Sequence, residues 1–174
     1  MSMRHIMGLG STSTLTHVDP KDVQPNAVDL RLGKVFKINI EKDLVLSEEV
    51  KEHKGSIEQE PFEDGWYYLY PGAYEVIMEN EIEVGHGEAG FVITRSTLNR
   101  NGVFLTSGLY DTGYNGVMAG VMHVRAGRIK IKPGTRIGQY LNFDAENIGH
   151  YDGDYGKGKA HDERYDSRPK AATI

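Results

Sequence analysis

Short segments of alternating apolar residues, each ended by a turn signal, constrain the fold of this chain most. The clearest cover residues 28–40, 66–70, 73–84, 116–124 and 137–143. Alternation at every second residue gives a strand two faces, whereas a helix needs apolar residues three or four positions apart. No long segment has the helical spacing, and residues 98–103 offer at most a turn or two. We therefore predict an all-β fold.

Pro-Gly pairs indicate where strands end and which strands follow as hairpins. Residues 66–70 stop at Pro71-Gly72, and residues 73–84 are expected to be the return strand. A second Pro-Gly pair is expected to join residues 129–131 to residues 137–143 in the same way. Many short strands with frequent turns favour a barrel or a jelly roll.

Other segments allow a coarser interpretation. Residues 28–40 form either one strand or a hairpin around Gly33-Lys34, and residues 116–124, apolar on both faces, are expected to be buried on both. Residues 41–63 are charged and poor in large apolar side chains, which indicates a surface insertion or a long loop.

The 174 residues predict one domain with its own core. We divide it into an N-terminal arm (1–22), a β-barrel (23–146) and a flexible, Gly-rich C-terminal tail (147–174). We find no internal repeat.

Composition excludes several classes of protein. The chain has no cysteine, so it has no disulfide, thiolate metal site or thiol nucleophile. No apolar run is long enough to span a membrane, and the first residues lack the apolar core of a signal peptide. We therefore expect a soluble, cytoplasmic protein without a membrane partner. The net charge of -5 argues against nucleic-acid binding, although it leaves room for a local basic pocket.

Two polar clusters lie close together between strand-like segments. Arg95, Ser96 and Thr97 offer a guanidinium and two hydroxyl groups, and residues 108–114 carry one carboxylate and two aromatic rings on a turn bracketed by glycines. Phosphate ligands, a candidate base and a stacking ring within about twenty residues predict a binding or catalytic site. Each residue also has a structural interpretation, such as a turn aspartate or a core tyrosine.

Five motifs in order resemble the trimeric dUTPase and dCTP deaminase superfamily, over roughly residues 23–159. They are QPNAVDLRLG (24–33), RSTLNR (95–100), YDTGYNG (110–116), PGTRIGQ (133–139) and YGKGK (155–159). The resemblance implies a distorted jelly-roll β-barrel that assembles as a homotrimer. It also implies sites between subunits, which the tail of one chain can close on another.

The resemblance also implies roles in the hydrolysis of a pyrimidine deoxynucleoside triphosphate. Asp111 would activate the water that attacks the α-phosphate. Tyr114 would pack on the deoxyribose, and the backbone of residues 108–111 would read the base.

The phosphates would be held by a second group of residues. Arg95, Ser96 and Gln139 would bind phosphate oxygens. The other expected substrate-binding residues are Thr97, Arg100, Gly108, Tyr110, Lys157 and Lys159. No direct metal ligand is expected, because Mg²⁺ arrives with the triphosphate and keeps most of its waters. Asp29 either orders the core or approaches the metal through water.

Few residues distinguish the dUTPase branch of the superfamily from the dCTP deaminase branch. The resemblance implies that deaminases carry a glutamate ten residues after the hairpin aspartate, where this chain has Val121. Val121 and Tyr114 favour a dUTPase, which forms dUMP and pyrophosphate, whereas the opening motif and the tail spacing lean toward a dCTP deaminase. A deaminase, alone or combined with dUTP hydrolysis, is the alternative enzyme. A catalytically silent nucleotide-binding or regulatory protein is the alternative of another class.

Overall fold

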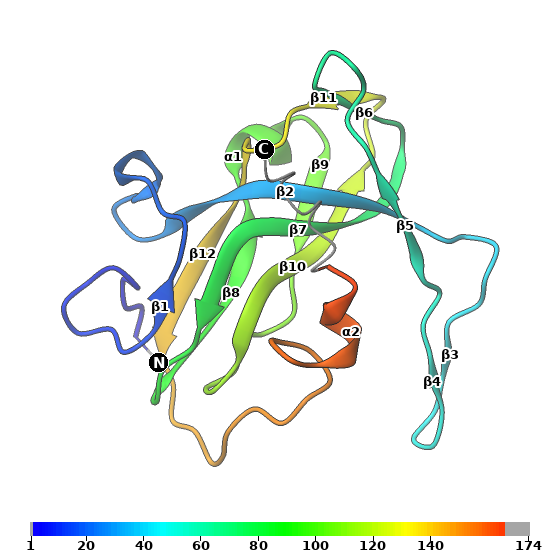
Figure 1. The fold of residues 1–174 in the computed structure, drawn as a ribbon. Coiled ribbons are helices and arrows are strands. Elements are labelled where there is room, and N and C mark those ends of the chain that lie inside the picture. The colour runs from blue at the N-terminus through cyan, green and yellow to red at the C-terminus, as the bar shows by residue number, and fades with distance from the viewer. Residues whose placement is uncertain (1, 166–174) are drawn as a thin grey trace, which may run out of the picture.

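Strands dominate the computed structural model, which describes residues 2–165, so the all-β prediction is confirmed (Figure 1). The elements are β1 (Thr14–Leu15), η1 (Pro20–Asp22), β2 (Val28–Ile38), β3 (Val45–Leu46), β4 (Lys51–Glu52), β5 (Ser56–Gln59), β6 (Tyr67–Leu69), β7 (Gly72–Glu83), β8 (Glu88–Thr94), α1 (Ser96–Arg100), β9 (Val103–Thr106), β10 (Asn115–Val124), β11 (Ile129–Ile131), β12 (Arg136–Asp144) and α2 (Ala160–Glu163). The turn or two expected at residues 98–103 occurs slightly earlier, as α1.

The main sheet curls into a nearly closed barrel. Its strands follow the order β8-β12-β2-β7-β10-β9. Side chains connect the two outermost strands: the Thr94 hydroxyl accepts from the Leu105 N–H at 2.7 Å and donates to its C=O at 2.9 Å, and the Ser107 hydroxyl accepts from the Val92 N–H at 2.9 Å. These hydroxyl groups satisfy backbone groups that an open edge would expose.

The two predicted hairpins at Pro-Gly pairs are wrong. β6 pairs with β11, while β7 lies between β2 and β10 in the main sheet. β12, likewise, pairs with β2 and β8 rather than with β11. A Pro-Gly turn fixes where a strand ends but not which strand its successor joins. The long β7 finds more pairing partners along β2 and β10 than the three residues of β6 could offer.

Residues 28–38 form one strand rather than a hairpin. Gly33 lies at an irregularity in the register between β2 and β7. A Cβ atom at this position would lie 2.9 Å from the Ile77 carbonyl oxygen, so only glycine allows the two backbones to approach this closely.

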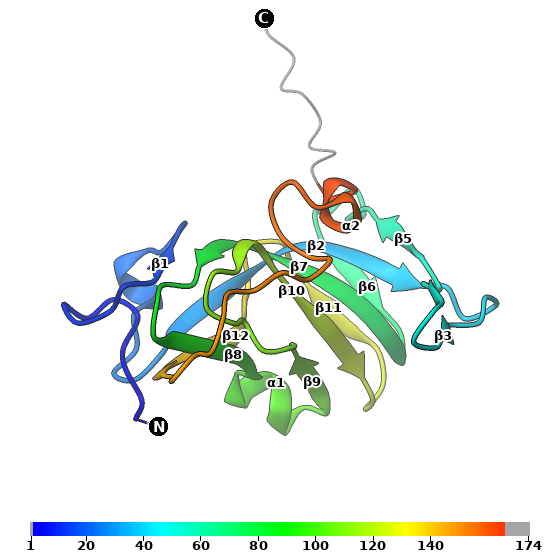
Figure 2. The same cartoon turned by 90° about the horizontal axis from the view of Figure 1, so that it is seen from below.

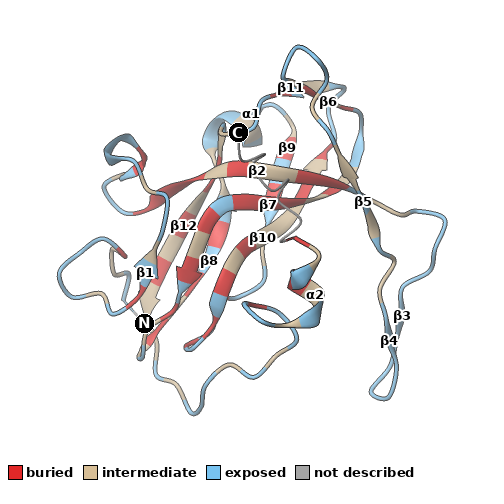
Figure 3. Cartoon of the chain, in the orientation of Figure 1, coloured by how far each residue is buried: buried red, intermediate tan, exposed pale blue. Residues whose placement is uncertain are grey.

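The core lies inside the barrel, and buried residues follow its strands (Figure 3). Met118, Met122 and Val124 of β10 point into it, whereas Val117 and Ala119 on the opposite face are half-buried. The prediction that β10 is buried on both faces therefore holds fully for one face only. Tyr165, beyond α2, packs against this outer face. Figure 2 shows α2 and α1 on opposite sides of the sheet.

The N-terminal segment, expected as an arm, packs along the barrel. β1 pairs with β7, and the buried Glu88 carboxylate accepts hydrogen bonds from Ser11, Thr12, Ser13 and Asn142. Burial alone would raise the pKa of Glu88, but these hydrogen bonds outweigh it and hold the pKa below its usual value. The segment is thus anchored to β8 through a single buried carboxylate.

The insertion and the tail both contain ordered elements. β3 and β4 form a ribbon that projects from the barrel, and β5 pairs with the edge of β2 (Figure 1). Residues 147–165 of the predicted flexible tail fold back over the hairpin between β9 and β10, and the remainder lies outside the described residues. In residues 2–165, no helix has the length and apolarity needed to cross a bilayer.

Candidate functional site

Two buried tyrosines fill the hairpin between β9 and β10. The pairing of β9 with β10 covers residues 121–124 of β10. The two tyrosine hydroxyl groups bond the backbone of β10 just before this paired segment. The Tyr110 hydroxyl donates to the Ala119 C=O at 2.9 Å and accepts from its N–H at 3.1 Å, and the Tyr114 hydroxyl donates to the Val117 C=O at 2.7 Å. Burial raises the pKa of both phenols, so both stay neutral.

The hairpin turn leaves the Asp111 carboxylate exposed. Backbone bonds close the turn, from the Tyr114 N–H to the Asp111 C=O and from the Gly113 N–H to the Val84 C=O. Within residues 2–165 the Asp111 side chain has no hydrogen bond or ion pair, so it does not cap its own turn. A carboxylate held in this way can accept a hydrogen bond from water or from a ligand.

Two of the expected phosphate-site residues and one further arginine contact Asp29, which is fully buried. Its carboxylate lies 3.2 Å from Arg95 Nε, 3.2 Å from Arg136 Nη1 and 3.0 Å from Gln139 Nε2. Asp29 and Gln139 are direct partners in the β2–β12 pairing, which explains their contact. Of the two roles considered for Asp29, the geometry favours the structural one. Gln139 donates to Asp29, and Arg136 joins the cluster although its sequence position alone suggested no role.

The remaining residues of the RSTLNR motif lie on α1. Ser96, Thr97 and Arg100 are exposed there, beside the Asp29 cluster. Tyr110 forms a bridge with Gly90, and Arg95 follows five residues later along β8. Five residues of strand span roughly 16 Å. Within one chain, Asp111 and the Arg95 cluster are therefore too far apart for their side chains to meet.

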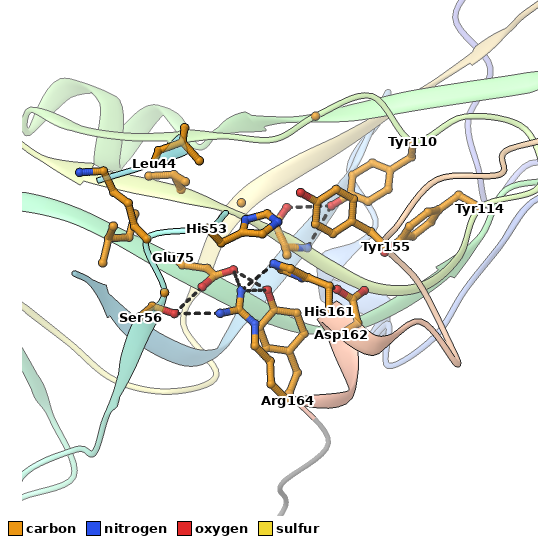
Figure 4. Close-up of a pocket in the computed structure, with 18 of the residues that line it drawn as sticks. Leu44, His53, Ser56, Glu75, Tyr110, Tyr114, Tyr155, His161, Asp162 and Arg164 are labelled. Carbon is orange, nitrogen blue, oxygen red and sulfur yellow. Dashed lines mark hydrogen bonds and ion pairs between the residues drawn. The ribbon is translucent and has the colours of Figure 1, made fainter. Parts of the chain in front are cut away.

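A cavity of about 580 Å³ lies between the hairpin and the folded tail (Figure 4). The hairpin contributes Gly108, Tyr110 and Tyr114, which were predicted to bind substrate. The other walls come from the insertion, β7 and the tail, including His53, Ser56, Glu75, Tyr151, Tyr155, His161, Arg164 and Tyr165. Sequence analysis missed these residues, because irregular charged segments give no signal of where they fold.

Glu75 lies beside Val121, the position that lacks the deaminase glutamate. The two residues are direct partners in the antiparallel pairing of β7 with β10, so their side chains share a face at a Cβ separation of roughly 5 Å. Glu75 accepts from Ser56 at 2.8 Å, from Arg164 at 2.6 Å and from the Tyr165 hydroxyl. An acid is therefore present next to Val121 in space, although none is adjacent in sequence.

The tail residues of the YGKGK motif run beside the hairpin. The Lys157 N–H donates to the Asn115 C=O at 2.7 Å, and its side chain is exposed. Lys159 Nζ lies 3.8 Å from Asp152. Gly156, with a φ of 114°, passes so close to Asn115 that a Cβ atom would lie 2.7 Å from its carbonyl oxygen. In the described part of the chain, no three His, Asp or Glu side chains gather as a metal site.

The fold and the site together define an all-β barrel that carries an exposed carboxylate on one hairpin, a cluster of arginines around the buried Asp29, and a separate cavity of the kind that binds small molecules. The family model described as dCTP deaminase-like matches residues 3–144, so this chain belongs to that family. The resemblance inferred from the five motifs is thereby confirmed.

Named relatives come from both branches. The chain is 32% identical to a deoxyuridine 5'-triphosphate nucleotidohydrolase of Methanocaldococcus jannaschii, over 83% of this chain and 94% of the relative. It is 30% identical to a dUMP-forming dCTP deaminase of Thermobifida fusca, over 72% and 66%. A similar fold, with a TM-score of 0.57 and 18% identity, occurs in a dCTP deaminase from Agrobacterium tumefaciens. This likeness covers 75% of the present chain but only 42% of that protein.

Proposed function

We propose that this protein hydrolyses dUTP to dUMP and pyrophosphate. The observation that carries the proposal is the exposed, unpaired carboxylate of Asp111, held by backbone bonds next to a cavity-lining tyrosine. Relatives at about 30% identity bear the name of this activity, which supports the same choice. Val121, an apolar residue at the position of the deaminase glutamate, supports hydrolysis as well.

In the proposed reaction, Asp111 accepts a proton from a water molecule. The water oxygen forms a bond to the α-phosphorus, and the bond from that phosphorus to the bridging oxygen of the pyrophosphate breaks. Tyr114 packs on the deoxyribose, while Arg95, Ser96 and Gln139 hold phosphate oxygens, supported by Thr97, Arg100 and the two tail lysines. Asp29 fixes the Arg95 guanidinium and the Gln139 amide in place.

Magnesium belongs to the substrate in this proposal. The described residues contain no cluster of three metal-binding side chains, and a Mg²⁺ ion bound to a triphosphate needs few protein ligands. The exposed carboxylate of Asp111 could accept a hydrogen bond from the ion's hydration shell. This donor set therefore fits a hydrated ion that enters with the triphosphate.

The site is proposed to form between copies of the chain. Asp111 and the Arg95 cluster lie roughly 16 Å apart along β8, so one chain alone cannot present both to the same substrate. We infer a homotrimer of jelly-roll barrels, in which the hairpin of one copy faces the phosphate-binding residues of the next.

The test is to incubate the protein with Mg²⁺ and each deoxynucleoside triphosphate and to measure pyrophosphate release. Asp111→Asn should lower turnover of dUTP about a hundredfold or more, the order expected for losing a general base, while nucleotide binding survives. Asp43→Asn, which changes an exposed aspartate of the insertion with no hydrogen bond or ion pair within residues 2–165, is the matched control. Unchanged turnover in Asp111→Asn would remove this residue from the mechanism.

Deamination of dCTP is a second candidate, because Glu75 lies across from Val121 in the same cavity. In that reaction, water adds to carbon 4 of cytosine, Glu75 carries the water proton to the ring and the leaving amine, and ammonia and dUTP form. Ammonia release from dCTP that Glu75→Gln abolishes would support it. If dCTP yields no ammonia, deamination is excluded and hydrolysis of dUTP is the remaining candidate reaction.

A further inference from the structure

The cavity extends well beyond the hairpin. Tyr114 and Tyr110 line one end, and Ala119, Gly120 and Val121 form a floor of small side chains. Past Val121 the cavity continues to His53, from the segment between β4 and β5, and to His161 of α2 (Figure 4). A pyrimidine is no larger than the ring of one tyrosine, so it would occupy only a small part of about 580 Å³.

Residues outside the family match build much of the far end. The match ends at residue 144, whereas Tyr155, His161 and Arg164 follow it in the chain. Arg164 and Tyr165 bond Glu75 of β7, which holds α2 over the cavity. This part of the wall is therefore a feature of the present chain and not of the matched domain.

The far end is aromatic and can form hydrogen bonds. The His53 ring lies 4.8 Å from that of His161 and 6.5 Å from that of Tyr155, measured between centroids. His161 is already engaged, through Nδ1 with Asp162 at 3.1 Å and through Nε2 with Arg164 at 3.1 Å. Neither ring nitrogen of His53, in contrast, has a hydrogen-bond partner within residues 2–165.

The charge state of His53 suits a neutral ligand group. Burial, and then the charges of His161, Lys51 and Arg164, lower the pKa of His53, and Glu75 opposes them only in part. The ring is therefore neutral at pH 7 and carries one donor and one acceptor nitrogen.

We propose that this site takes pyrimidine deoxynucleoside triphosphates that carry a hydrogen-bonding substituent at carbon 5, and that His53 binds the substituent. The proposal rests on the proposed function for its orientation. With the sugar on Tyr114, the ring atoms farthest from the sugar bond point past Val121 toward His53. The apolar floor accommodates the ring, and the unpaired imidazole distinguishes a polar substituent from an apolar one of similar size.

The test compares 5-hydroxymethyl-dUTP with dTTP, whose 5-methyl group fills similar space without a hydroxyl. The wild-type protein should show a kcat/KM about three- to tenfold higher for the hydroxymethyl nucleotide, the ratio expected for one neutral hydrogen bond. His53→Phe should bring this ratio close to one, and His53→Gln should restore part of it.

A matched control and a binding measurement complete the experiment. His17→Asn changes an exposed histidine outside the cavity, at a left-handed backbone position that asparagine tolerates, and should keep the wild-type ratio. Calorimetry with the non-hydrolysable α,β-imido forms of both nucleotides measures the same preference as a ratio of Kd values. That ratio tests the substituent site even if the protein releases no pyrophosphate, which would refute the proposed function alone. A wild-type ratio near one, or a ratio that survives in His53→Phe, would overturn the inference.

Discussion

Asp29 is the residue on which the geometry of the Arg95 cluster depends. Its buried carboxylate contacts both Arg95 and Arg136, and it accepts from Gln139. Asp29→Asn keeps the size of the side chain but removes the charge that holds the two guanidinium groups. We expect a loss of about 1.5–3 kcal/mol in the free energy of unfolding, typical of a hydrogen bond to a charged group.

The same substitution should raise KM for dUTP more than it lowers kcat, because Asp29 positions Arg95 without touching substrate. Urea unfolding and steady-state kinetics measure the two effects, with Asp43→Asn as the exposed control. An Asp29→Asn protein with wild-type stability and KM would show that Arg95 and Gln139 keep their positions without this carboxylate.

Short sequence motifs identified some residues of the candidate site, but not the residues that lie next to them in space. Asp111 and Arg95 could be named because each lies in a short polar motif between strands. Arg136, Glu75 and His53 could not, because their neighbours in space are distant in the chain. No acid adjoins Val121 in the sequence, yet strand pairing places Glu75 directly opposite it. The roles predicted for the site residues stay predictions.

Among the elements, strand positions could be predicted and strand partners could not. Alternation found β2, β7, β10 and β12 to within a few residues, because burial of one face requires it. Pairing is decided by competition among all strands of the barrel, which no local pattern records. The sequence indicated the N-terminal segment only as an arm, because its contacts with Glu88 are made by short polar residues without periodicity.

The attachment of the N-terminal segment to β8 gives a prediction at the scale of elements. Glu88→Gln replaces an acceptor of several hydrogen bonds with an amide that cannot accept them all, and should lower the free energy of unfolding by about 1.5–3 kcal/mol at pH 7. Glu83→Gln, exposed at the end of β7, is the control.

The effect of Glu88→Gln should depend on pH in a defined direction. Because the folded-state pKa of Glu88 is lowered, its carboxylate contributes stability above the unfolded pKa of about 4.3, and this contribution is lost as pH falls through the folded pKa. Urea unfolding between pH 7 and pH 3 should therefore show the wild type and the variant converging in acid. A constant difference across that range would mean that the Glu88 charge does not hold the segment.

At the scale of the whole molecule, the separation of Asp111 from the Arg95 cluster predicts that activity requires assembly. Both lie along β8, one beside its start and one just beyond its end. Light scattering should show three chains of 19.4 kDa each in the active species. A fully active monomer would exclude a shared site.

Mixed oligomers test the shared site directly. Asp111→Asn and Arg95→Ala should each be nearly inactive alone, because every site then lacks either its base or a phosphate ligand. Co-expressed in equal amounts, they should regain about a quarter of wild-type activity, since random assembly pairs an intact Asp111 from one chain with an intact Arg95 from its neighbour at that frequency. Co-expression of Asp111→Asn with Asp111→Ala, which leaves no intact base anywhere, is the matched control and should restore nothing. If the first mixture stays as inactive as its components, the site is not shared between chains. Each chain would then have to use its own Asp111 and Arg95 on the same substrate, despite their separation along β8.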